Sequence, residues 1–255
     1  MKTPIRTRRT VLIYGLSVLL FVGGWWFAST RTIPAFLPSP LDTFKAFGDL
    51  IEQKILLQAV GISLLRIYSG WLLGAGLIGI PVGILMGRIR VIREFVTPYV
   101  EFFRFIPPIA FVTLSLIWFG VGEMSKIMLI TYTSFFICVL NTMAGVIGVK
   151  EGVIRAARSM GANELQLLFS VVIPSTIPSI VTGMRVAMGI SFGTIVAAEM
   201  IAANSGIGYI IWSSRNYMLT DQIFVGIVTL GALGFVSDRT ISLIVDKFLR
   251  RFRPE

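Results

Sequence analysis

The sequence contains no histidine and only one cysteine among its 255 residues. Without histidine, imidazole-based catalysis, histidine metal sites and a histidine-driven pH switch are excluded. One cysteine cannot form an intrachain disulfide, and because Cys138 lies within an apolar run we expect it to serve in packing. These absences exclude many membrane enzymes and some proton-coupled carriers.

Charged residues are also scarce, at 14% of the chain against 55% hydrophobic residues. A soluble domain of this length could not hide so much apolar surface in its core, so most of the surface must face lipid. The net charge of +10 does not indicate nucleic-acid binding, because Lys and Arg lie in short clusters between apolar runs and not along one polar face.

Six apolar stretches have the length of a membrane-spanning helix, which needs roughly 20 residues to cross about 30 Å of hydrocarbon. They run approximately from Val11 to Ala28, Ile67 to Met86, Phe95 to Phe119, Ile127 to Ile147, Ile177 to Ala203 and Ile223 to Val245. The sequence therefore predicts an all-α polytopic membrane protein with about six transmembrane helices.

The basic residues between these stretches predict an orientation, because short loops rich in Lys and Arg remain cytoplasmic. Four basic clusters occur, namely Lys2, Arg6, Arg8 and Arg9; Arg88, Arg90 and Arg93; Lys150, Arg155 and Arg158; and Lys247, Arg250, Arg251 and Arg253. They fall on alternate loops, so both termini are predicted to be cytoplasmic.

The predicted organisation has a cytoplasmic N-terminus (residues 1–10), an anchor helix (11–30), an external loop (31–57), a transmembrane core (58–245) and a cytoplasmic basic tail (246–255). Arg8 and Arg9 before an apolar run imitate a secretory or twin-arginine signal. The run is long, ends at Trp25 and Trp26 and lacks a clear cleavage site, which favours a retained anchor. In the external loop, three prolines followed by an amphipathic stretch predict an extended turn and a short interfacial helix.

Glycines and prolines predict how the core helices pack and bend. A stripe of small residues leaves one face of the second stretch nearly bare, for packing within the chain or against another subunit. Its members are Gly70, Gly74, Gly79, Gly83 and Gly87. Pro81 in that stretch, and Pro107 with Pro108 in the third, remove helical hydrogen bonds and should bend both helices.

The loop from Lys150 to Pro174 is too long for a simple turn and too polar to enter lipid. Glu151 and Arg155 have the spacing of an ion pair on one helix. Gly161 stands where a helix ends in a left-handed cap, and Asn163 with Gln166 can form a capping box for a second short helix. We interpret this pair of helices as a docking element; the alternative is a loop that merely connects two spans.

This loop resembles the EAA loop of binding-protein-dependent ABC importer permeases. The family pattern Glu-Ala-Ala-x3-Gly-x9-Ile-x-Leu-Pro is matched in spacing by Arg155-Ala156-Ala157, Gly161, Val171 and Ile173-Pro174, with Arg155 where glutamate is usual. Further matches are Leu37-Pro38-Ser39-Pro40, Ser63-Leu64-x-Arg66, Gly79-x-Pro81-x-Gly83, Pro107-Pro108-x-Ala110, Trp118-Phe119-Gly120-x-Gly122-Glu123-x-Ser125-Lys126, Ala198-Glu199-x-Ile201 and Gly206-x-Gly208. Together they look like the nitrate, sulfonate, taurine and bicarbonate branch, and most like its alkanesulfonate and taurine permeases.

The resemblance implies an ABC importer permease (MetI-like) fold in a bacterial cytoplasmic membrane. It implies a homodimer with two ATP-binding cassette subunits, which bind ATP and Mg, and an external solute-binding protein. The coupling loop, residues 150–174, would then contact the ATPase through Glu151, Arg155, Ala156, Ala157, Arg158, Gly161, Ala162 and Pro174. Independently, the sequence has no Gly-x4-Gly-Lys-Ser/Thr phosphate loop, so no ATPase site or other cofactor is expected in this chain.

Glu199 is the most conspicuous acidic residue inside a predicted span, where burying a charge is expensive. It either pairs structurally, for example with Arg66, or lines or gates the pathway. Ser191 and Thr194 could face the pathway with it, although such side chains commonly bond to their own helix backbone. The bends at Pro107 and Pro108 are either architectural or part of a gate.

Two other functions compete with that of an importer permease. An autonomous ion-coupled carrier would share the span count and Glu199, whereas a membrane-embedded enzyme is disfavoured by the lack of histidine and of a convergent nucleophile and base. The cargo is not identified by charge, because the basic clusters are explained by topology; the resemblance alone implies a small, anionic solute of the sulfonate, taurine or nitrate kind.

Overall fold

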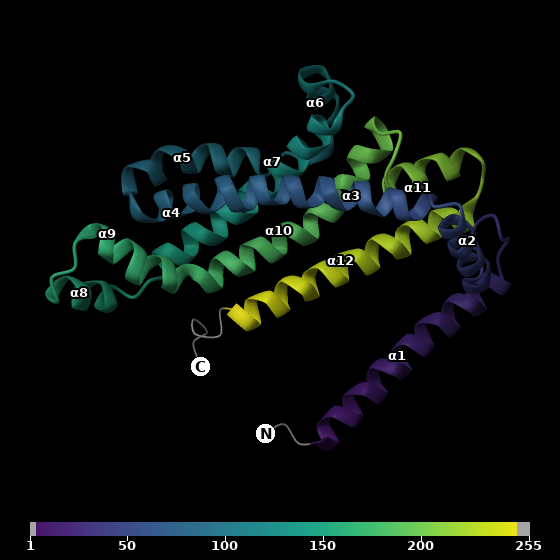
Figure 1. Cartoon of the computed structure of the whole chain (residues 1–255), viewed down its shortest axis with the longest axis horizontal. Helices are drawn as coiled ribbons and strands as arrows, with labels where there is room; N and C mark the ends of the chain where they lie inside the picture. The colour runs from purple at the N-terminus through teal and green to yellow at the C-terminus, as the bar shows by residue number, and fades with distance from the viewer. Residues whose placement is uncertain (1–3, 249–255) are drawn as a thin grey trace.

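The computed structural model describes residues 4–248, and within them the chain is helical apart from short connections. In chain order the elements are α1 (Pro4–Thr30), α2 (Pro40–Glu52), α3 (Ile55–Trp71), η1 (Leu72–Gly79), α4 (Ile80–Arg88), α5 (Arg90–Phe103), η2 (Pro108–Phe111), α6 (Val112–Phe119), α7 (Glu123–Ile147), α8 (Glu151–Ser159), α9 (Glu164–Leu167), η3 (Leu168–Val172), α10 (Ile173–Ala202), α11 (Ile207–Asn216) and α12 (Thr220–Phe248). Helices α8 and α9 lie at one end of the bundle, and α2 and α11 lie at the other (Figure 1).

Five helical segments of the described chain are long and apolar enough to cross a membrane. They are Leu12–Thr30, Ile55–Arg88, Glu123–Ile147, Glu164–Ile201 and Thr220–Val245. A sixth is formed if α5 and η2 with α6 count as one span, although the chain turns by 87° between them. The expected all-helical fold with about six spans is confirmed, while the basic clusters at the termini lie partly outside the described residues.

Three boundaries differ from those predicted. The third stretch is not one helix, because the chain leaves α5 at Phe103 and resumes at Pro108, where neither Pro107 nor Pro108 has an amide hydrogen to continue the ladder. The second span begins at Ile55 and not near Ile67, because polar side chains lower the hydropathy of its first turns. The loop predicted between the last two spans contains α11. The short helix expected in the first loop is present as α2.

The glycine stripe packs α3, η1 and α4 directly against α7. A Cβ at Gly74 would lie 2.2 Å from the Thr131 carbonyl oxygen, and one at Gly87 would lie 2.4 Å from Cβ of Val146. The wider spacing of five between Gly74 and Gly79 falls within the π-helical segment η1, whose i→i+5 turn adds one residue and keeps both glycines on the α7 face. The structure thus supports the prediction that this stripe packs within the chain.

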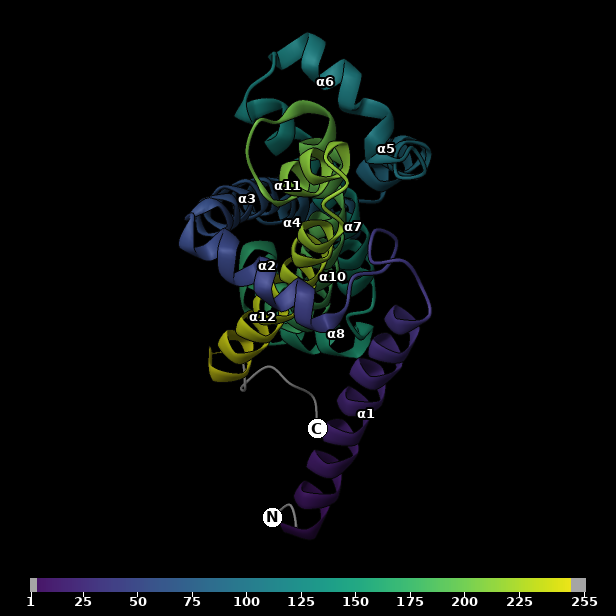
Figure 2. The same cartoon turned by 90° about the vertical axis from the view of Figure 1, so that its right-hand side faces the viewer.

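The core lies around α7 and α10, which are flanked by α3 and α12. Its largest cluster includes Ile67, Trp71, Ile130, Met188 and Ile195. Helix α1 extends away from this bundle (Figures 1 and 2), and none of its residues from 12 to 30 is buried within the chain. The C-terminal end of α1 is held by Trp25, whose ring stacks on Phe224 and whose Nε1 donates to the Pro38 carbonyl at 3.0 Å.

Candidate functional site

The predicted coupling loop folds as two short helices joined by a left-handed glycine. Gly161 has φ +84°, and its amide donates to the Arg158 carbonyl at 2.9 Å while that of Ala162 donates to Ala157 at 3.1 Å. Asn163 and Gln166 form the capping box in both directions, at 2.8 and 2.9 Å. The local geometry predicted for this segment is therefore present.

One side of this loop is fixed to the membrane helices by apolar packing. Ala157 and Leu167 are buried together with Val146 of α7 and Val172 of η3. Ala157 therefore faces the end of the bundle from α8. The other side is exposed and contains apolar residues, with Met160 at 81%, Leu165 at 68% and Phe169 at 65% exposure. Exposed apolar residues of this kind mark contact with a protein partner or with the membrane.

A charged group ties the loop to the end of α4. Glu164 accepts hydrogen bonds from Arg88 and, at 2.9 Å, from Arg158. We call these three residues the Glu164 cluster. Sequence spacing did not predict it, because Arg88 lies far from Glu164 in the chain. Of the other predicted loop residues, Glu151 and Arg155 form an exposed ion pair at 3.3 Å.

The remaining predicted loop positions are placed as follows. Ala156 is exposed on α8, Ala162 is partly buried after the glycine turn, and Pro174 occupies the first turn of α10. These three residues lie along the segment that leads from α8 into the long helix α10. Arg155, which stands where the EAA pattern has glutamate, has a side chain that is 72% exposed.

A second charged group lies at the opposite end of the bundle. Arg66 donates to both oxygens of Glu123, at 2.5 and 2.6 Å, and to Glu199 at 2.8 Å. It also donates to the carbonyl and hydroxyl of Ser205 at 2.8 and 3.2 Å. Ser63 completes the group by donating to Glu199 at 2.8 Å. We call these five residues the Arg66 cluster.

The Arg66 cluster also holds the start of α11. The Gly208 amide donates to Glu199 at 2.8 Å and the Ile207 amide donates to Ser63 at 3.0 Å, so two amides that the helix itself leaves unpaired are satisfied. Negative charge at this position also interacts favourably with the helix dipole. At Gly206, φ is +113° and a Cβ would collide with the Glu199 carboxylate at 2.3 Å. Glycine is required there.

The Arg66 cluster is buried at its centre, whereas the Glu123 side chain at its edge is 58% exposed. Glu199 and Ser63 are 0% exposed and Arg66 is 2% exposed. The pairing of Glu199 with Arg66 that the sequence suggested is present. The sequence analysis did not predict the second partner of Arg66, Glu123. The sequence did contain an indication of the cluster, since four of the motifs noted above each supply a residue to it.

The two hydroxyl residues predicted beside Glu199 face α7. Ser191 lies 3.0 Å from Ser134, and Thr194 lies 3.3 Å from Thr133. Both hydroxyls are buried and also bond to carbonyls of their own helix, at 2.7 and 3.2 Å. They link the two central helices and do not lie with Glu199 in one open site.

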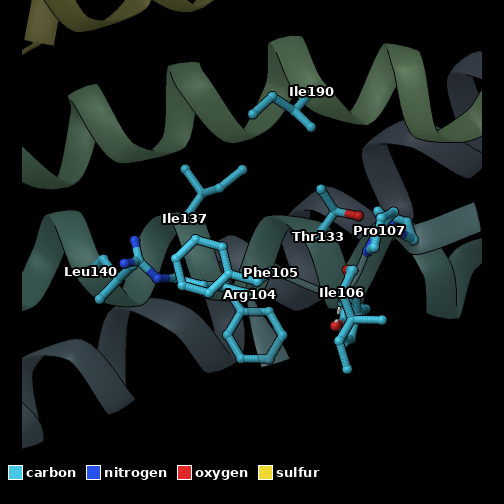
Figure 3. A pocket seen from close by; sticks show the side chains of 11 residues that line it. Arg104, Phe105, Ile106, Pro107, Thr133, Ile137, Leu140 and Ile190 are labelled. Carbon is cyan, nitrogen blue, oxygen red and sulfur yellow. Dashed lines mark hydrogen bonds between the residues drawn. The ribbon is translucent and has the colours of Figure 1, made fainter. Parts of the chain in front are cut away.

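The predicted bend at Pro107 and Pro108 borders a pocket of about 320 Å³ that we call the central pocket. Its lining includes Arg104, Phe105, Pro107, Thr133, Ile137, Leu140 and Ile190, from the chain break, α7 and α10. Figure 3 shows the Arg104 guanidinium reaching along α7 toward Leu140, with Pro107 and Thr133 at the other end. The Tyr132 hydroxyl donates to the Phe103 carbonyl at 2.5 Å, which holds the end of α5 against α7.

None of these sites resembles a metal centre or a cofactor site. Among residues 4–248, no group of three histidine, cysteine, aspartate or glutamate side chains is close enough to hold a metal ion. The clusters pair each carboxylate with arginine, and the central pocket contains no carboxylate. This arrangement suits packing, docking and the passage of a solute.

Comparison with known proteins gives consistent results. Residues 79–253 match the family of binding-protein-dependent transport system inner membrane components. The chain is 38% identical to the taurine transport system permease protein TauC of Escherichia coli, over 98% of this chain and 91% of that protein. It is 34% identical to the putative aliphatic sulfonates transport permease protein SsuC of Bacillus subtilis, over 84% and 77% of the two chains. It is 32% identical to the nitrate import permease protein NrtB of Synechocystis, over 84% and 75%.

Solved structures share the fold at low sequence identity. A chain of the MetNI methionine ABC transporter, in an inward-facing conformation, has a TM-score of 0.66 at 21% identity and covers 78% of this chain and 97% of its own. A chain of a bacterial alginate ABC transporter has a TM-score of 0.61 at 14% identity and covers 98% of both.

Proposed function

This chain belongs to the family of binding-protein-dependent inner membrane transport components, as an ABC importer permease without an ATPase site of its own, and from this premise we propose that two copies form the translocation pathway for a small anionic solute. We propose further that two separate ATPase subunits drive it and that an external binding protein delivers the solute.

The cargo is proposed from what the relatives share. Taurine, aliphatic sulfonates and nitrate, named in the three relatives, are all small solutes that carry an oxyanion. The alignments cover most of both chains, including the central helices. We therefore propose a sulfonate-like, taurine-like or nitrate-like cargo.

The observation that carries the coupling role is the two-sided construction of α8 and α9. Ala157 and Leu167 attach them to the bundle, while Met160, Leu165 and Phe169 remain exposed toward a partner. Because η3 continues without a break into α10, a force on these helices acts directly on a 30-residue helix. That helix ends near Glu199 in the Arg66 cluster, so the two ends of the chain are mechanically connected.

The proposed mechanism is alternating access. Closure of the ATPase pair on ATP would displace α8 and α9, and the two orientations of the dimer would differ in which end of the pathway is open. No covalent chemistry is required of this chain. Differential affinity of the ATPase subunits and of the liganded binding protein for the two states would shift the equilibrium between them, and ATP hydrolysis would supply the free energy of each cycle.

The test is reconstitution. The tagged chain, purified from its native membrane, should co-purify with an equal amount of an ATPase subunit.

The second experiment measures transport by the reconstituted complex. In proteoliposomes with the liganded binding protein, uptake of taurine, butanesulfonate or nitrate should require ATP. Uptake by the chain alone, driven by an ion gradient, would establish the ion-coupled carrier instead.

The orientation is proposed to place both termini on the side of α8 and α9. Single cysteines at Ser39 and Ser213, in a Cys138→Ser background, should react with an impermeant maleimide in intact cells, because both positions lie at the opposite end. A cysteine at Ser159 should react only after permeabilisation. The reverse pattern would invert the topology.

A further inference from the structure

The central pocket lies at mid-depth of the two helices that form the core. Thr133 and Leu140 bracket the midpoint of α7, and Ile190 lies near the middle of α10. The third wall is the irregular chain between α5 and η2. Irregular backbone at membrane depth is tolerated where it is buried in protein or lines a water-filled cavity. The pocket of about 320 Å³ is within the size range of small-molecule sites.

Arg104 is the one charged side chain among the eleven that line this pocket. Elsewhere at membrane depth, Arg66 is paired with Glu123 and Glu199, and Arg185 with Asp238 at 2.7 Å. Within residues 4–248, no carboxylate forms an ion pair with Arg104, and its guanidinium lies over the Phe105 ring at 4.6 Å. Glu101 of the same helix does not line the pocket. Arg104 is exposed in the single chain, so its guanidinium is accessible to a solute in the pocket and its unit charge favours an anion there.

The remaining walls are mostly apolar. Phe105, Ile137, Leu140 and Ile190 surround the space beside the guanidinium (Figure 3). A purely inorganic anion would leave these side chains in contact with water, whereas a short hydrocarbon body would cover them. Covering these walls with the methylenes of a ligand removes apolar surface from water and stabilises the bound state. The pocket therefore combines one cationic contact with an apolar slot.

We propose that the central pocket is a binding site on the transport pathway for a small organic anion, with its anionic group on Arg104 and its hydrocarbon body against Ile137 and Ile190. This inference rests on the proposed function and narrows it. An alkanesulfonate fits both parts of the pocket, whereas nitrate fits only the cationic part. Arg104 is a binding residue here, in addition to any favourable interaction with the C-terminal end of α5.

The first test measures the charge of the pocket without any transport. A cysteine replaces Ile137 in a Cys138→Ser background of the purified complex, and its rate of reaction is measured with two methanethiosulfonates of similar size. One carries a sulfonate and the other a trimethylammonium group. The ratio of the sulfonate rate to the ammonium rate should fall about tenfold or more in Arg104→Gln, because one unit charge near the thiol is removed. It should stay unchanged in Arg93→Gln, which removes a charge from α5 away from the pocket.

The second test measures selectivity in proteoliposomes. Arg104→Gln should lower ATP-driven uptake of butanesulfonate about tenfold or more, since a charge-assisted contact is lost, while liganded binding protein still stimulates ATP hydrolysis within about twofold. Arg104→Lys should retain an intermediate rate. Ile190→Ser should reduce butanesulfonate uptake more than nitrate uptake, because it removes apolar wall only.

Three results would overturn the inference. They are an unchanged reagent ratio in Arg104→Gln, no reaction of either reagent at position 137, and normal butanesulfonate uptake in Arg104→Gln. If Arg104→Gln instead loses ATPase stimulation and thermal stability with an unchanged ratio, its role is structural. Failure of the unsubstituted complex to transport any of the three solutes would refute the proposed cargo, whereas the reagent ratio would still decide whether the pocket is an anion site.

Discussion

The two charged clusters at opposite ends of the bundle have reversed compositions, and they differ in whether the shared central residue is buried. In one, Arg66 is shared between Glu123 and Glu199; in the other, Glu164 is shared between Arg88 and Arg158. The Arg66 and Glu199 side chains are 3% and 0% exposed, with Glu123 at 58%, whereas those of Arg158 and Glu164 are 52% and 66% exposed, with Arg88 at 24%.

The difference shows that burial, and not the pair of residue types, decides what an ion pair does. Removing one partner of a buried pair leaves an uncompensated charge, so the Arg66 cluster behaves as a fixed joint. An exposed pair exchanges readily with water and contributes little. The Glu164 cluster can therefore open and re-form if α8 and α9 move as proposed. One end of the chain is held and the other end is adjustable, which suits the proposed coupling role.

Arg66→Met is the substitution with the largest expected effect on stability. It leaves Glu199 buried beside Ser63 without a cation, and we expect a loss of about 3–5 kcal/mol in the free energy of unfolding. Thermal unfolding of the detergent-purified chain, followed by tryptophan fluorescence, measures it. Arg158→Met is the matched control and should unfold like the original chain. If the two substitutions lowered the free energy of unfolding equally, the Arg66 cluster would be no more rigid than the Glu164 cluster.

Glu199→Gln tests how much the charge of Glu199 contributes to the Arg66 cluster. The amide keeps the shape and the contacts with Ser63 and Gly208, and Arg66 keeps Glu123, so the loss should be smaller, about 1–3 kcal/mol. We expect assembly to be preserved and transport to be slower. Glu199→Leu should lower the free energy of unfolding further, because the Ser63 hydroxyl and the Gly208 amide lose their acceptor. Normal transport in Glu199→Gln, with a lower melting temperature in Glu199→Leu alone, would limit Glu199 to a structural role.

Gly161→Val tests the adjustable end. A residue with a Cβ at φ +84° carries a backbone penalty of about 1 kcal/mol, and no neighbouring atom lies within 4 Å to add a clash in the isolated chain. The spans should stay folded, while transport and ATPase stimulation fall together and the ligand affinity of the binding protein is unchanged.

The matched control for this substitution is Gly161→Asn, because asparagine tolerates the left-handed region. It should retain most of the stimulation. The assay is ATP hydrolysis by the reconstituted complex with and without liganded binding protein. Normal stimulation in Gly161→Val would remove this loop from a coupling role.

Arg158→Ala should have the smallest effect. It removes one of two arginines from an exposed carboxylate, and Arg88 remains as a partner. We expect no measurable shift in the melting temperature and only a minor change in transport. A large loss of stability would show that the Glu164 cluster is a fixed joint like the other.

Much of the coupling loop was predictable because its geometry depends on near neighbours. A glycine at a helix end and an asparagine three residues before a glutamine satisfy backbone groups within the same segment, so Gly161 and the capping box follow from spacing alone. The positions of the long apolar helices followed from length and hydropathy. The start of α3 did not, because Ser63 and Arg66 lower the hydropathy there and only their burial against Glu199 explains their presence in a span.

Composition and short-range spacing were enough to predict the helices, their lipid surroundings and the local form of the coupling loop, since each depends on composition or on residues a few positions apart. The folded chain was needed to find that Arg66 is shared with Glu123, that Ser191 faces α7, and that the break at Pro107 opens a pocket beside Arg104. The physical reason is that these contacts join residues far apart in the chain. They depend on how glycine-lined helices approach one another and on the angle at which a broken helix turns.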